Sequence, residues 1–375
     1  MDRHPSDFDR APFLVIWEVT RACALACVHC RAEAIARRDP RELTTDEGMR
    51  LIDQVRAFGT PAPLLVLTGG DPMWRKDLAP LVRYATDAGL TVALTPSGTP
   101  APTRARLVEL ADAGLSRVAV SLDGPDAETH DAFRGVKGSY RWTLDILERA
   151  ADIGLALQIN TTVSRSTLPR LKEMAARVRD FPLTMWAVFF LVQIGRGATL
   201  DQITADECEE VLDFLYDFSL TAPFGIKTTE APHYRRVVET RDRAASRDRR
   251  VEAGRLGPRQ LRAPRAVNDG SGFVFVDHVG EICPSGFLPM PRGNVRDGNL
   301  VATYREDEVF RKLRNPDMLE DHCGRCEWRA ACGGSRSRAF AATGNPFAGD
   351  PLCAHRPQLS LLAPAMPALS GAVSS

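Results

Sequence analysis

Short apolar runs alternate with longer amphipathic stretches over the first half of the chain. The apolar runs have the length of strands and lie at 14–19, 64–67, 91–94, 117–121, 157–163 and 185–190. The amphipathic stretches have the spacing of helices and lie at 45–58, 78–88, 103–113, 140–153 and 168–180. Several of them end at a glycine, the usual residue just after a helix. Six strands alternating with helices predict parallel βαβ units and an α/β fold.

The alternation ends after residue 191, and this divides the chain into regions. Six βα units fit either a partial (β/α)6 barrel or a doubly wound sheet, and the pattern does not choose between them. Beyond them, a helix opened by Thr204, an extended segment at 225–230 and a charged helix at 233–250 are expected. We expect a flexible N-terminus at 1–10, the βα domain at 11–200, a helical connection with an Arg-rich loop at 201–270, a small Cys-rich domain at 271–356 and a flexible tail at 357–375.

The charge of the chain gives no reason to expect a nucleic-acid or membrane partner. Its 375 residues include 48 basic and 48 acidic side chains, so the formal net charge is +0. The Arg-rich stretch at 241–265 also contains acidic residues and has no interleaved aromatic residues, which argues against a nucleic-acid contact. No apolar run is long enough to span a bilayer, and no targeting segment is visible. We therefore expect a cytoplasmic protein.

Seven of the nine cysteines fall into two groups. Within each group the thiols are close in sequence, which indicates metal or iron–sulfur ligation and not a disulfide framework. Cys208 lies on a predicted helix and is expected in the core, whereas Cys283 is left as a free thiol, a substrate-site residue or an unusual ligand. The first group is Cys23, Cys27 and Cys30, and the second is Cys323, Cys326, Cys332 and Cys353.

The first group reads CxxxCxxC directly after the first strand. Three thiolates can hold three irons of a cubane cluster and leave the fourth iron open, as a metal that binds a substrate requires. Two alternatives are weaker. The cysteines could be small apolar residues on one helix face, or they could bind zinc with His29 as the fourth ligand.

The run from Trp17 to Cys30 resembles the signature of the radical S-adenosylmethionine superfamily. The chain over about 11–356 is similar to members that carry a C-terminal SPASM or twitch extension. The resemblance implies a partial (β/α)6 TIM-like barrel followed by a small Cys-rich SPASM/twitch-like domain. It also implies that Cys23, Cys27 and Cys30 hold a [4Fe–4S] cluster that cleaves S-adenosylmethionine. The resulting 5′-deoxyadenosyl radical would abstract hydrogen from a substrate.

Several further segments resemble cosubstrate-binding motifs of that superfamily, and nearly all lie at or just after predicted strand ends. Barrel folds place their sites at this edge of the sheet. Gly69-Gly70-Asp71-Pro72 is similar to the GGEP motif, and Ser121-Leu122-Asp123-Gly124 is similar to the SxDG segment. The cosubstrate-binding residues implied by the resemblance are His29, Gly69, Gly70, Asp71, Ser97, Ser121, Asp123, Arg134 and Asn160.

The second cysteine group reads Cx2Cx5C from Cys323 to Cys332, with Cys353 further along the chain. Four thiolates can close the coordination of a [4Fe–4S] cluster, and a four-cysteine zinc site is the alternative. SPASM enzymes have another cysteine where this chain has Arg336. The resemblance with this departure implies one auxiliary [4Fe–4S] cluster on Cys323, Cys326, Cys332 and Cys353, not two.

The motifs are most similar to enzymes of alternative haem and haem d1 biosynthesis and to mycofactocin-type peptide maturases. The expected substrate is a tetrapyrrole, modified oxidatively at a side chain, or another small molecule; a peptide is the alternative. Propionates would need basic residues, for which the 241–265 stretch, Arg292 and Arg296 are candidates. The ten residues before Ala11 are too few for a peptide-recognition domain.

No catalytic acid or base follows from the sequence. Candidates by location are Glu230, His233, Tyr234, Asp277 and His278. The resemblance implies a low-potential electron donor, flavodoxin or ferredoxin. A non-enzymatic iron–sulfur protein for electron transfer or sensing would explain the cysteines but not the Gly-Gly-Asp-Pro and Ser-Leu-Asp-Gly segments.

Overall fold

One sheet organises the molecule. The computed structural model describes residues 8–248 and 267–357. In these residues the strands follow the order β7-β6-β5-β4-β3-β2-β1-β8-β9, and every neighbouring pair is parallel except β8 with β9. The strands are β1 (Leu14–Glu18), β2 (Leu64–Thr68), β3 (Val92–Leu94), β4 (Arg117–Ser121), β5 (Ala156–Val163), β6 (Leu183–Phe190), β7 (Gly225–Thr229), β8 (Phe273–Val276) and β9 (Ile282–Cys283).

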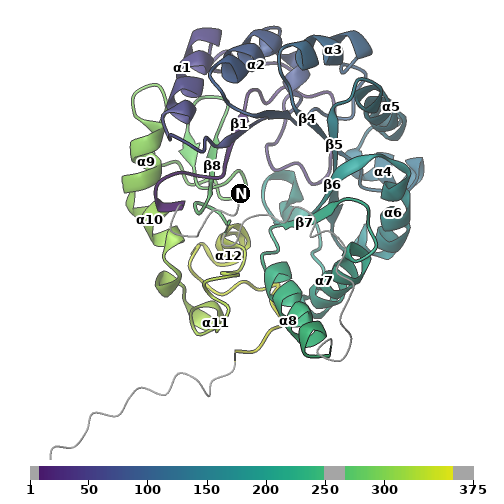
Figure 1. Cartoon of the computed structure of the whole chain (residues 1–375), viewed down its shortest axis with the longest axis vertical. Helices are drawn as coiled ribbons and strands as arrows, with labels where there is room; N and C mark the ends of the chain where they lie inside the picture. The colour runs from purple at the N-terminus through teal and green to yellow at the C-terminus, as the bar shows by residue number, and fades with distance from the viewer. Residues whose placement is uncertain (1–7, 249–266, 358–375) are drawn as a thin grey trace, which may run out of the picture.

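The sheet curves into an open ring with helices on its outside (Figure 1). The helices α11 and α12 lie near the opening of the ring, between α8 and α10. The helices are α1 (Thr45–Arg56), α2 (Leu78–Asp87), α3 (Arg104–Asp112), α4 (Ala127–Arg134), α5 (Ser139–Asp152), α6 (Leu171–Arg177), α7 (Ala205–Ser219), α8 (His233–Asp248), α9 (Leu300–Glu306), α10 (Glu308–Arg314), α11 (Asp321–Gly324) and α12 (Arg336–Thr343).

The predicted α/β barrel is confirmed, and its sheet extends beyond the six strands that the periodicity indicated. β7 continues the sheet beside β6, and β8 pairs in parallel with β1, as in the register of Leu14 with Phe273. Both strands come from ranges assigned by sequence to the connection and the Cys-rich domain. They have five and four residues. The hydrophobic pattern of so short a strand does not indicate which distant strand it will pair with.

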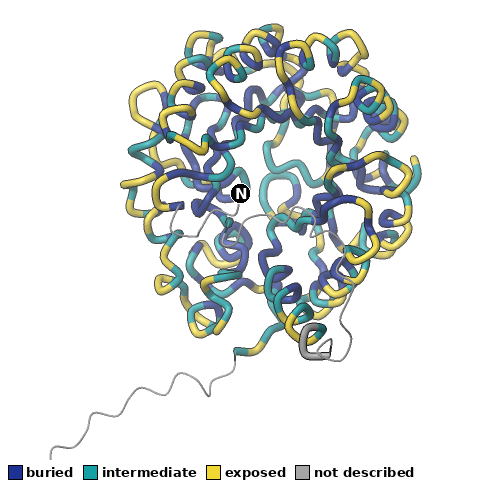
Figure 2. Tube along the Cα trace, in the orientation of Figure 1, coloured by how far each residue is buried: buried dark blue, intermediate teal, exposed yellow. Residues whose placement is uncertain are grey.

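Alternate residues of the central strands point to opposite faces of the sheet. In β5, Leu157, Ile159 and Val163 are buried in the core cluster, whereas Gln158 and Asn160 are only half-buried. The first face packs under the outer helices, and the second faces the inside of the ring. Figure 2 shows buried residues along the strands and on the inward sides of the helices. The core is therefore a layer between sheet and helices, and the interior of the ring stays open.

The chain is fixed to the barrel from Phe8 onward. The Phe8 side chain is 1% exposed, and the Tyr304 hydroxyl donates to its carbonyl oxygen over 2.7 Å. Arg314 forms a 3.0 Å ion pair with Asp9. The buried side chain of Phe8 and the contacts of Phe8 and Asp9 thus attach the last part of the expected flexible N-terminus to the barrel. The rest of that terminus, most of the Arg-rich loop and the tail from 358 lie outside the described residues.

The helices within 8–248 and 267–357 are all too short or too polar to cross a membrane.

The packing of α1 on β1 depends on the absence of a side chain at Gly48. A Cβ atom there would lie 2.5 Å from Cη2 of Trp17, which is fully buried. We predict that Gly48→Ala lowers the free energy of unfolding by about 1–3 kcal/mol, because overpacking outweighs the better helix propensity of alanine. Denaturation midpoints would measure the loss.

The double variant Gly48→Ala/Trp17→Phe is the matched test of this contact. Phenylalanine has no atom at the position of the indole Cη2, so the second substitution should reduce the cost of the first. Strictly additive losses in the double-mutant cycle would contradict the proposed clash.

Candidate active site

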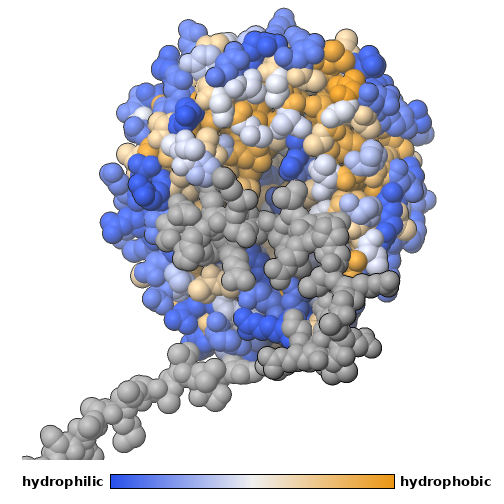
Figure 3. All heavy atoms as spheres, viewed as in Figure 1, coloured by the Kyte–Doolittle hydropathy of each residue, from blue (hydrophilic) through white to orange (hydrophobic). Residues whose placement is uncertain are grey.

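A cavity of about 510 Å³ occupies the inside of the ring. Figure 3 shows hydrophobic residues gathered in the upper centre and on the right of this face, with hydrophilic residues around most of its rim. The first cysteine group lies at the wall of this cavity, as do most of the residues that sequence linked to the cosubstrate. Those that line it are Cys23, Cys27, Cys30, His29, Gly69, Gly70, Ser97, Ser121, Arg134 and Asn160.

The cysteine loop is held in place by the end of β2. The amide nitrogen of Gly70 donates to the carbonyl oxygen of Thr20 over 2.8 Å, and that of Asp71 donates to Ala22 over 2.7 Å. A Cβ atom on Gly70 would lie 2.4 Å from the Ala22 carbonyl oxygen. The two glycines therefore allow the backbone of β2 to approach the cysteine loop, in addition to lining the cavity.

Asp71 does not line the cavity but is buried behind the cavity wall, where it holds the neighbouring turn by hydrogen bonds. Its side chain is fully buried, and it accepts hydrogen bonds from the Thr99 hydroxyl over 2.7 Å and from the Met73 amide over 3.2 Å. Ser97 carries the contact into the cavity, because its hydroxyl donates to the Gly70 carbonyl over 2.5 Å and lies 3.4 Å from Sγ of Cys23. Asp71 thus fixes the turn that presents Ser97 to the first cysteine.

Asp123 is also behind the cavity wall, where it forms an ion pair with Arg134. Burial by itself would raise the pKa of this carboxyl, but the charge of Arg134 holds the pKa below its ordinary value. The other side of the Arg134 guanidinium faces the cysteine loop, with Nη1 3.8 Å from Sγ of Cys27. The charge of Arg134, which the resemblance implied for cosubstrate binding, is therefore already paired with Asp123.

His29 stacks on Phe133 of α4, with ring centroids 4.2 Å apart and an angle of 14° between the planes. Burial and the charge of Arg134 lower the pKa of His29 to about 3, so its imidazole is neutral near pH 7. Phe133 covers one face of the His29 ring. On the neighbouring strands, Ser121 and Asn160 are paired in register and both line the cavity.

The second cysteine group forms a separate site. Cys323, Cys326, Cys332 and Cys353 together line a small pocket beside α8 and α11. Arg336, which replaces the additional cysteine of SPASM enzymes, is buried and donates to the carbonyl oxygens of Pro346 over 2.9 Å and Ala348 over 2.8 Å. Its Nη2 atom lies 3.6 Å from Sγ of Cys323. At this position the chain therefore has a cation that stabilises the loops around Cys323.

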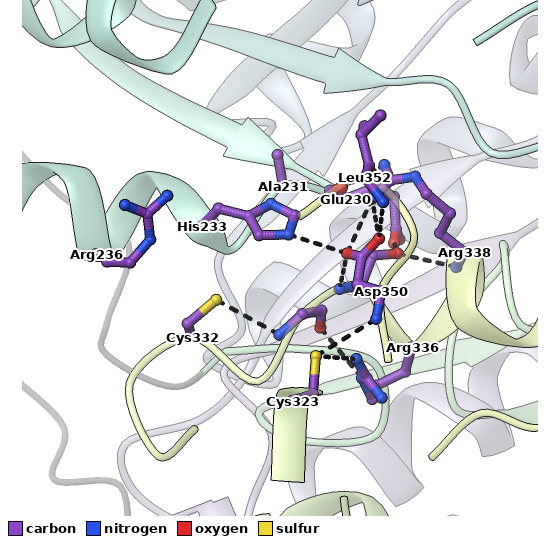
Figure 4. Close-up of polar contacts among 12 residues, drawn as sticks. Glu230, Ala231, His233, Arg236, Cys323, Cys332, Arg336, Arg338, Asp350 and Leu352 are labelled. Carbon is purple, nitrogen blue, oxygen red and sulfur yellow. Dashed lines mark hydrogen bonds and ion pairs between the residues drawn. The ribbon is translucent and has the colours of Figure 1, made fainter. Parts of the chain in front are cut away.

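Asp350 connects this second site to the barrel (Figure 4). Its carboxylate accepts two 3.1 Å contacts from Arg338 and lies 3.2 Å from Nε2 of His233, the first residue of α8. The Asp350 amide in turn lies 3.4 Å from Sγ of Cys323. Burial alone would raise the pKa of Asp350, but Arg338 and His233 hold it well below its ordinary range. Asp350 is therefore a buried anion that joins α8, α12 and a cysteine.

The two remaining cysteines belong to the core. Cys208 on α7 is fully buried in the core cluster, as predicted. Cys283 on β9 is buried, and neither cavity wall includes it. Burial raises the pKa of the Cys283 thiol to about 12, so the thiol is protonated near neutral pH. Of the three roles left open for Cys283, its position fits a free thiol.

Of the acid–base candidates, Glu230 lines the cavity and the other four do not. Glu230 follows β7 with φ of 59°, in the left-handed region that is costly for a non-glycine residue. It accepts a 2.5 Å hydrogen bond from the Ser335 hydroxyl. Burial, and next the charge of Asp269, raise the pKa of Glu230 well above its ordinary value. The Glu230 carboxyl therefore faces the cavity in surroundings that favour its protonated form.

Of the basic residues proposed for propionates, Arg292 and Arg296 do not line the cavity, and most of the 241–265 stretch lies outside the described residues. Arg292 forms a 3.0 Å ion pair with Asp307, and Arg296 forms a 2.7 Å ion pair with Glu47, both away from the cavity. Sequence reasoning instead missed the cations that do line it: Arg31, Arg117, Arg196, Lys227 and Arg235. The sequence did hold a signal for Arg117 and Lys227. Each is a charged residue within a strand, at one of the alternate positions that face the cavity.

Both cysteine groups fit the clusters that their spacing indicates. Three thiols beside an open cavity leave space for a further ligand on a cluster, whereas four thiols around a small pocket can close one. The donor atoms of Cys326, Glu327 and His355 also lie within 4.8 Å of one another, so nitrogen and oxygen donors adjoin the second site. We propose iron–sulfur ligation at both sites, with zinc as the alternative at the second.

We predict that Gly70→Ala prevents the first cluster from assembling. The added methyl group would meet two carbonyl oxygens of the cysteine loop, which cannot move away as a side chain can. Bound iron after reconstitution should fall by roughly half, because one of two four-iron clusters is lost. Gly197→Ala is the control, since its Cβ would lie no closer than 3.4 Å to its neighbours, among them His29. Equal iron content in the two variants would contradict the prediction.

We predict that Asp350→Ala selectively removes the second cluster. Removal of one partner from a buried ion pair typically costs about 3–5 kcal/mol, and the loss here falls on the segment that contains Cys323. Asp317→Ala is the matched control, because Asp317 forms a 3.2 Å ion pair with Arg329 at an exposed position. Electron paramagnetic resonance of the reduced protein separates the two clusters. A normal second cluster in Asp350→Ala would show that this carboxylate is dispensable.

Comparison with known proteins places this geometry in a family. Residues 17–177 match the model of the Radical SAM superfamily. The AdoMet-dependent heme synthase of Oleidesulfovibrio alaskensis is 41% identical over 96% of this chain and 91% of its own length. The mycofactocin maturase MftC of Mycolicibacterium smegmatis is 31% identical over 92% of this chain and 83% of its own length.

The fold also has solved counterparts. Streptococcus suis SuiB bound to S-adenosylmethionine aligns with a TM-score of 0.70 at 13% identity, over 92% of this chain and 78% of that protein. This likeness concerns the fold, a barrel followed by a C-terminal domain, and confirms the fold that the resemblance implied. The chain belongs to the radical S-adenosylmethionine superfamily, in its SPASM-type branch, and is an enzyme that uses a [4Fe–4S] cluster and S-adenosylmethionine.

Proposed function

We propose that this enzyme abstracts hydrogen from a side chain of a tetrapyrrole and so begins an oxidative modification of that side chain. The observation that carries the proposal is the cavity of about 510 Å³, which adjoins Cys23, Cys27 and Cys30 and has space for a large substrate. The 41% identity to an AdoMet-dependent heme synthase supports the same substrate class.

The residues of the chain itself would hold the cluster, position the cosubstrate and shield the radical. With the cluster and S-adenosylmethionine bound, the site supplies a 5′-deoxyadenosyl radical. Cys23, Cys27 and Cys30 would hold the cluster, and Gly70 and Ser97 keep the loop of Cys23 against β2. We propose that His29, Gly69, Gly70, Ser97, Ser121, Arg134 and Asn160 surround the cosubstrate, while Asp71 and Asp123 position their neighbours.

The apolar part of the cavity wall fits a tetrapyrrole ring. Phe273 and Phe275 of β8 and Phe287 present aromatic surface to the cavity, beside aliphatic residues of β1 and β2. Arg31 lies over the Phe275 ring at 4.6 Å and is ion-paired with Glu18 over 3.1 Å. This wall excludes water from one side of a bound ring, which protects a radical from side reactions.

The second proposed cluster would lie on Cys323, Cys326, Cys332 and Cys353. Glu230 links the surroundings of this cluster to the cavity. The backbone carbonyl of Glu230 accepts a 2.6 Å hydrogen bond from Arg338, and its side chain lines the cavity. We also propose that a low-potential flavodoxin or ferredoxin reduces the first cluster. Peptide maturation is the alternative function, supported by the 31% identity to mycofactocin maturase MftC.

The test is anaerobic production of 5′-deoxyadenosine by the reconstituted protein, with dithionite, with and without iron-coproporphyrin III. We expect the porphyrin to stimulate product formation several-fold, and a Cys23/Cys27/Cys30→Ala variant to form none, because it cannot hold the cluster. Slow product formation that the porphyrin does not change would contradict the tetrapyrrole substrate and favour a peptide. No product from a fully loaded protein would contradict the assignment of the first cysteine group.

A further inference from the structure

Two kinds of cation line the cavity, and they differ in whether a carboxylate accompanies them. Arg31 and Arg134 are ion-paired with Glu18 and Asp123. Arg117 and Lys227 have no ion pair or hydrogen bond from their side chains to any part of the chain that the structure describes. Arg235 donates to two carbonyl oxygens, those of Val267 and Ala331, which leave its charge uncompensated. These three side chains are half-buried in the cavity wall, and positive charge held there without a counterion is less costly when a ligand supplies the anion.

The three cations lie on one side of the ring. Arg117 is on β4, Lys227 is on β7, and Arg235 is on α8, which follows β7. Their charges are close enough to act on one another, since burial and then Arg117 and Arg235 lower the pKa of Lys227 to about 8. Arg196 also lines the cavity and has no carboxylate partner among the described residues, but it lies at the cysteine end: its charge acts on His29, and its backbone amide donates to the carbonyl oxygen of Cys30 over 3.0 Å.

The strand geometry separates part of this group from the cysteine end. Arg117, Ala119 and Ser121 all line the cavity, as alternate residues of one strand must. Ser121 lies at the end of β4 where the cosubstrate motifs gather, and Arg117 lies four residues earlier, about 13 Å along the strand. A substrate that contacts Arg117 can therefore still extend toward the cysteine loop.

The opposite wall is apolar. Leu14 and Ile16 of β1, Leu64 and Val66 of β2 and Phe273 of β8 line the cavity there, and the strand order brings these three strands together. On the cationic side, Gln158 and Asn160 add amide groups. The cavity thus suits a ligand with an apolar body and carboxylates along one edge.

We propose that Arg117, Lys227 and Arg235 form a subsite that binds the carboxylates of the substrate which do not react. The proposal rests on the tetrapyrrole function above and assigns the part of the cavity that orients the ring. Charge-assisted hydrogen bonds from these three groups would hold the carboxylates at one edge. The remaining side chain then faces the cysteine loop.

The test measures binding of iron-coproporphyrin III and of its tetramethyl ester to the cluster-loaded protein, by the change in Soret absorbance. The variants are Arg117→Met and Lys227→Met, which remove the charge and keep much of the side-chain volume. We expect each to weaken binding of the acid by about tenfold, as for loss of one charge-assisted hydrogen bond, and to leave ester binding nearly unchanged. Arg292→Met is the control, because Arg292 pairs with Asp307 away from the cavity.

Each outcome separates the subsite from the proposed function. Undiminished binding of the acid by both variants would overturn the subsite and leave the tetrapyrrole function standing. Equal weakening of acid and ester would mean a damaged cavity and would also overturn it. If the wild-type protein binds no porphyrin, the proposed function fails, and thermal stabilisation by tricarballylate then tests the subsite alone. Stabilisation of the wild type but not of Arg117→Met/Lys227→Met would support it, and any other result would overturn it.

Discussion

Strand β1 is hydrogen-bonded on both sides, to β2 and to β8, and the positions of both cysteine groups depend on these two ladders. The loop with Cys23, Cys27 and Cys30 leaves the C-terminal end of β1, where the end of β2 supports it through the backbone contacts of Gly70 and Asp71. On the other side, β8 attaches the chain after residue 267 to the barrel. A shift of β1 by one residue would exchange its core and cavity faces, so both contacts require the same register.

The open interior of the ring follows from what its inward positions contain. In a filled barrel these positions would be bulky and would pack against each other. Here they include small or polar residues, such as Ala93, Ala119, Ser121 and Asn160, and the cavity they leave reaches the cysteine loop. The stability of the fold consequently rests on the layer between sheet and helices, where Trp17 and Trp186 are fully buried. This division allows the inner face to carry charges and polar groups for a ligand.

Buried charge is used in two different ways in this molecule. Asp350, held by Arg338 and His233, is compensated from several directions and joins the second cysteine group to α8. Arg117 and Lys227 face a cavity and have no such compensation from the described chain. The first arrangement fixes structure, because each group has a partner that would be left unpaired by movement. The second leaves positive charge directed at the space where a substrate would lie.

The βα alternation, the two cysteine groups and the motifs at the strand ends could all be recognised from the sequence, because periodicity, thiol spacing and turn chemistry are local properties. The sequence also indicated the core position of Cys208. Other features could be seen only in the folded chain. There, β8 pairs with β1, and Asp71 and Asp123 lie behind the cavity wall. Arg336 supports the loop that contains Cys323. Arg292 and Arg296 are ion-paired away from the cavity, whereas Arg117, Lys227 and Arg235 line it, which the sequence did not indicate. These features depend on contacts between residues far apart in the chain, and whether a charge faces solvent, a partner or a cavity is fixed only when those residues meet.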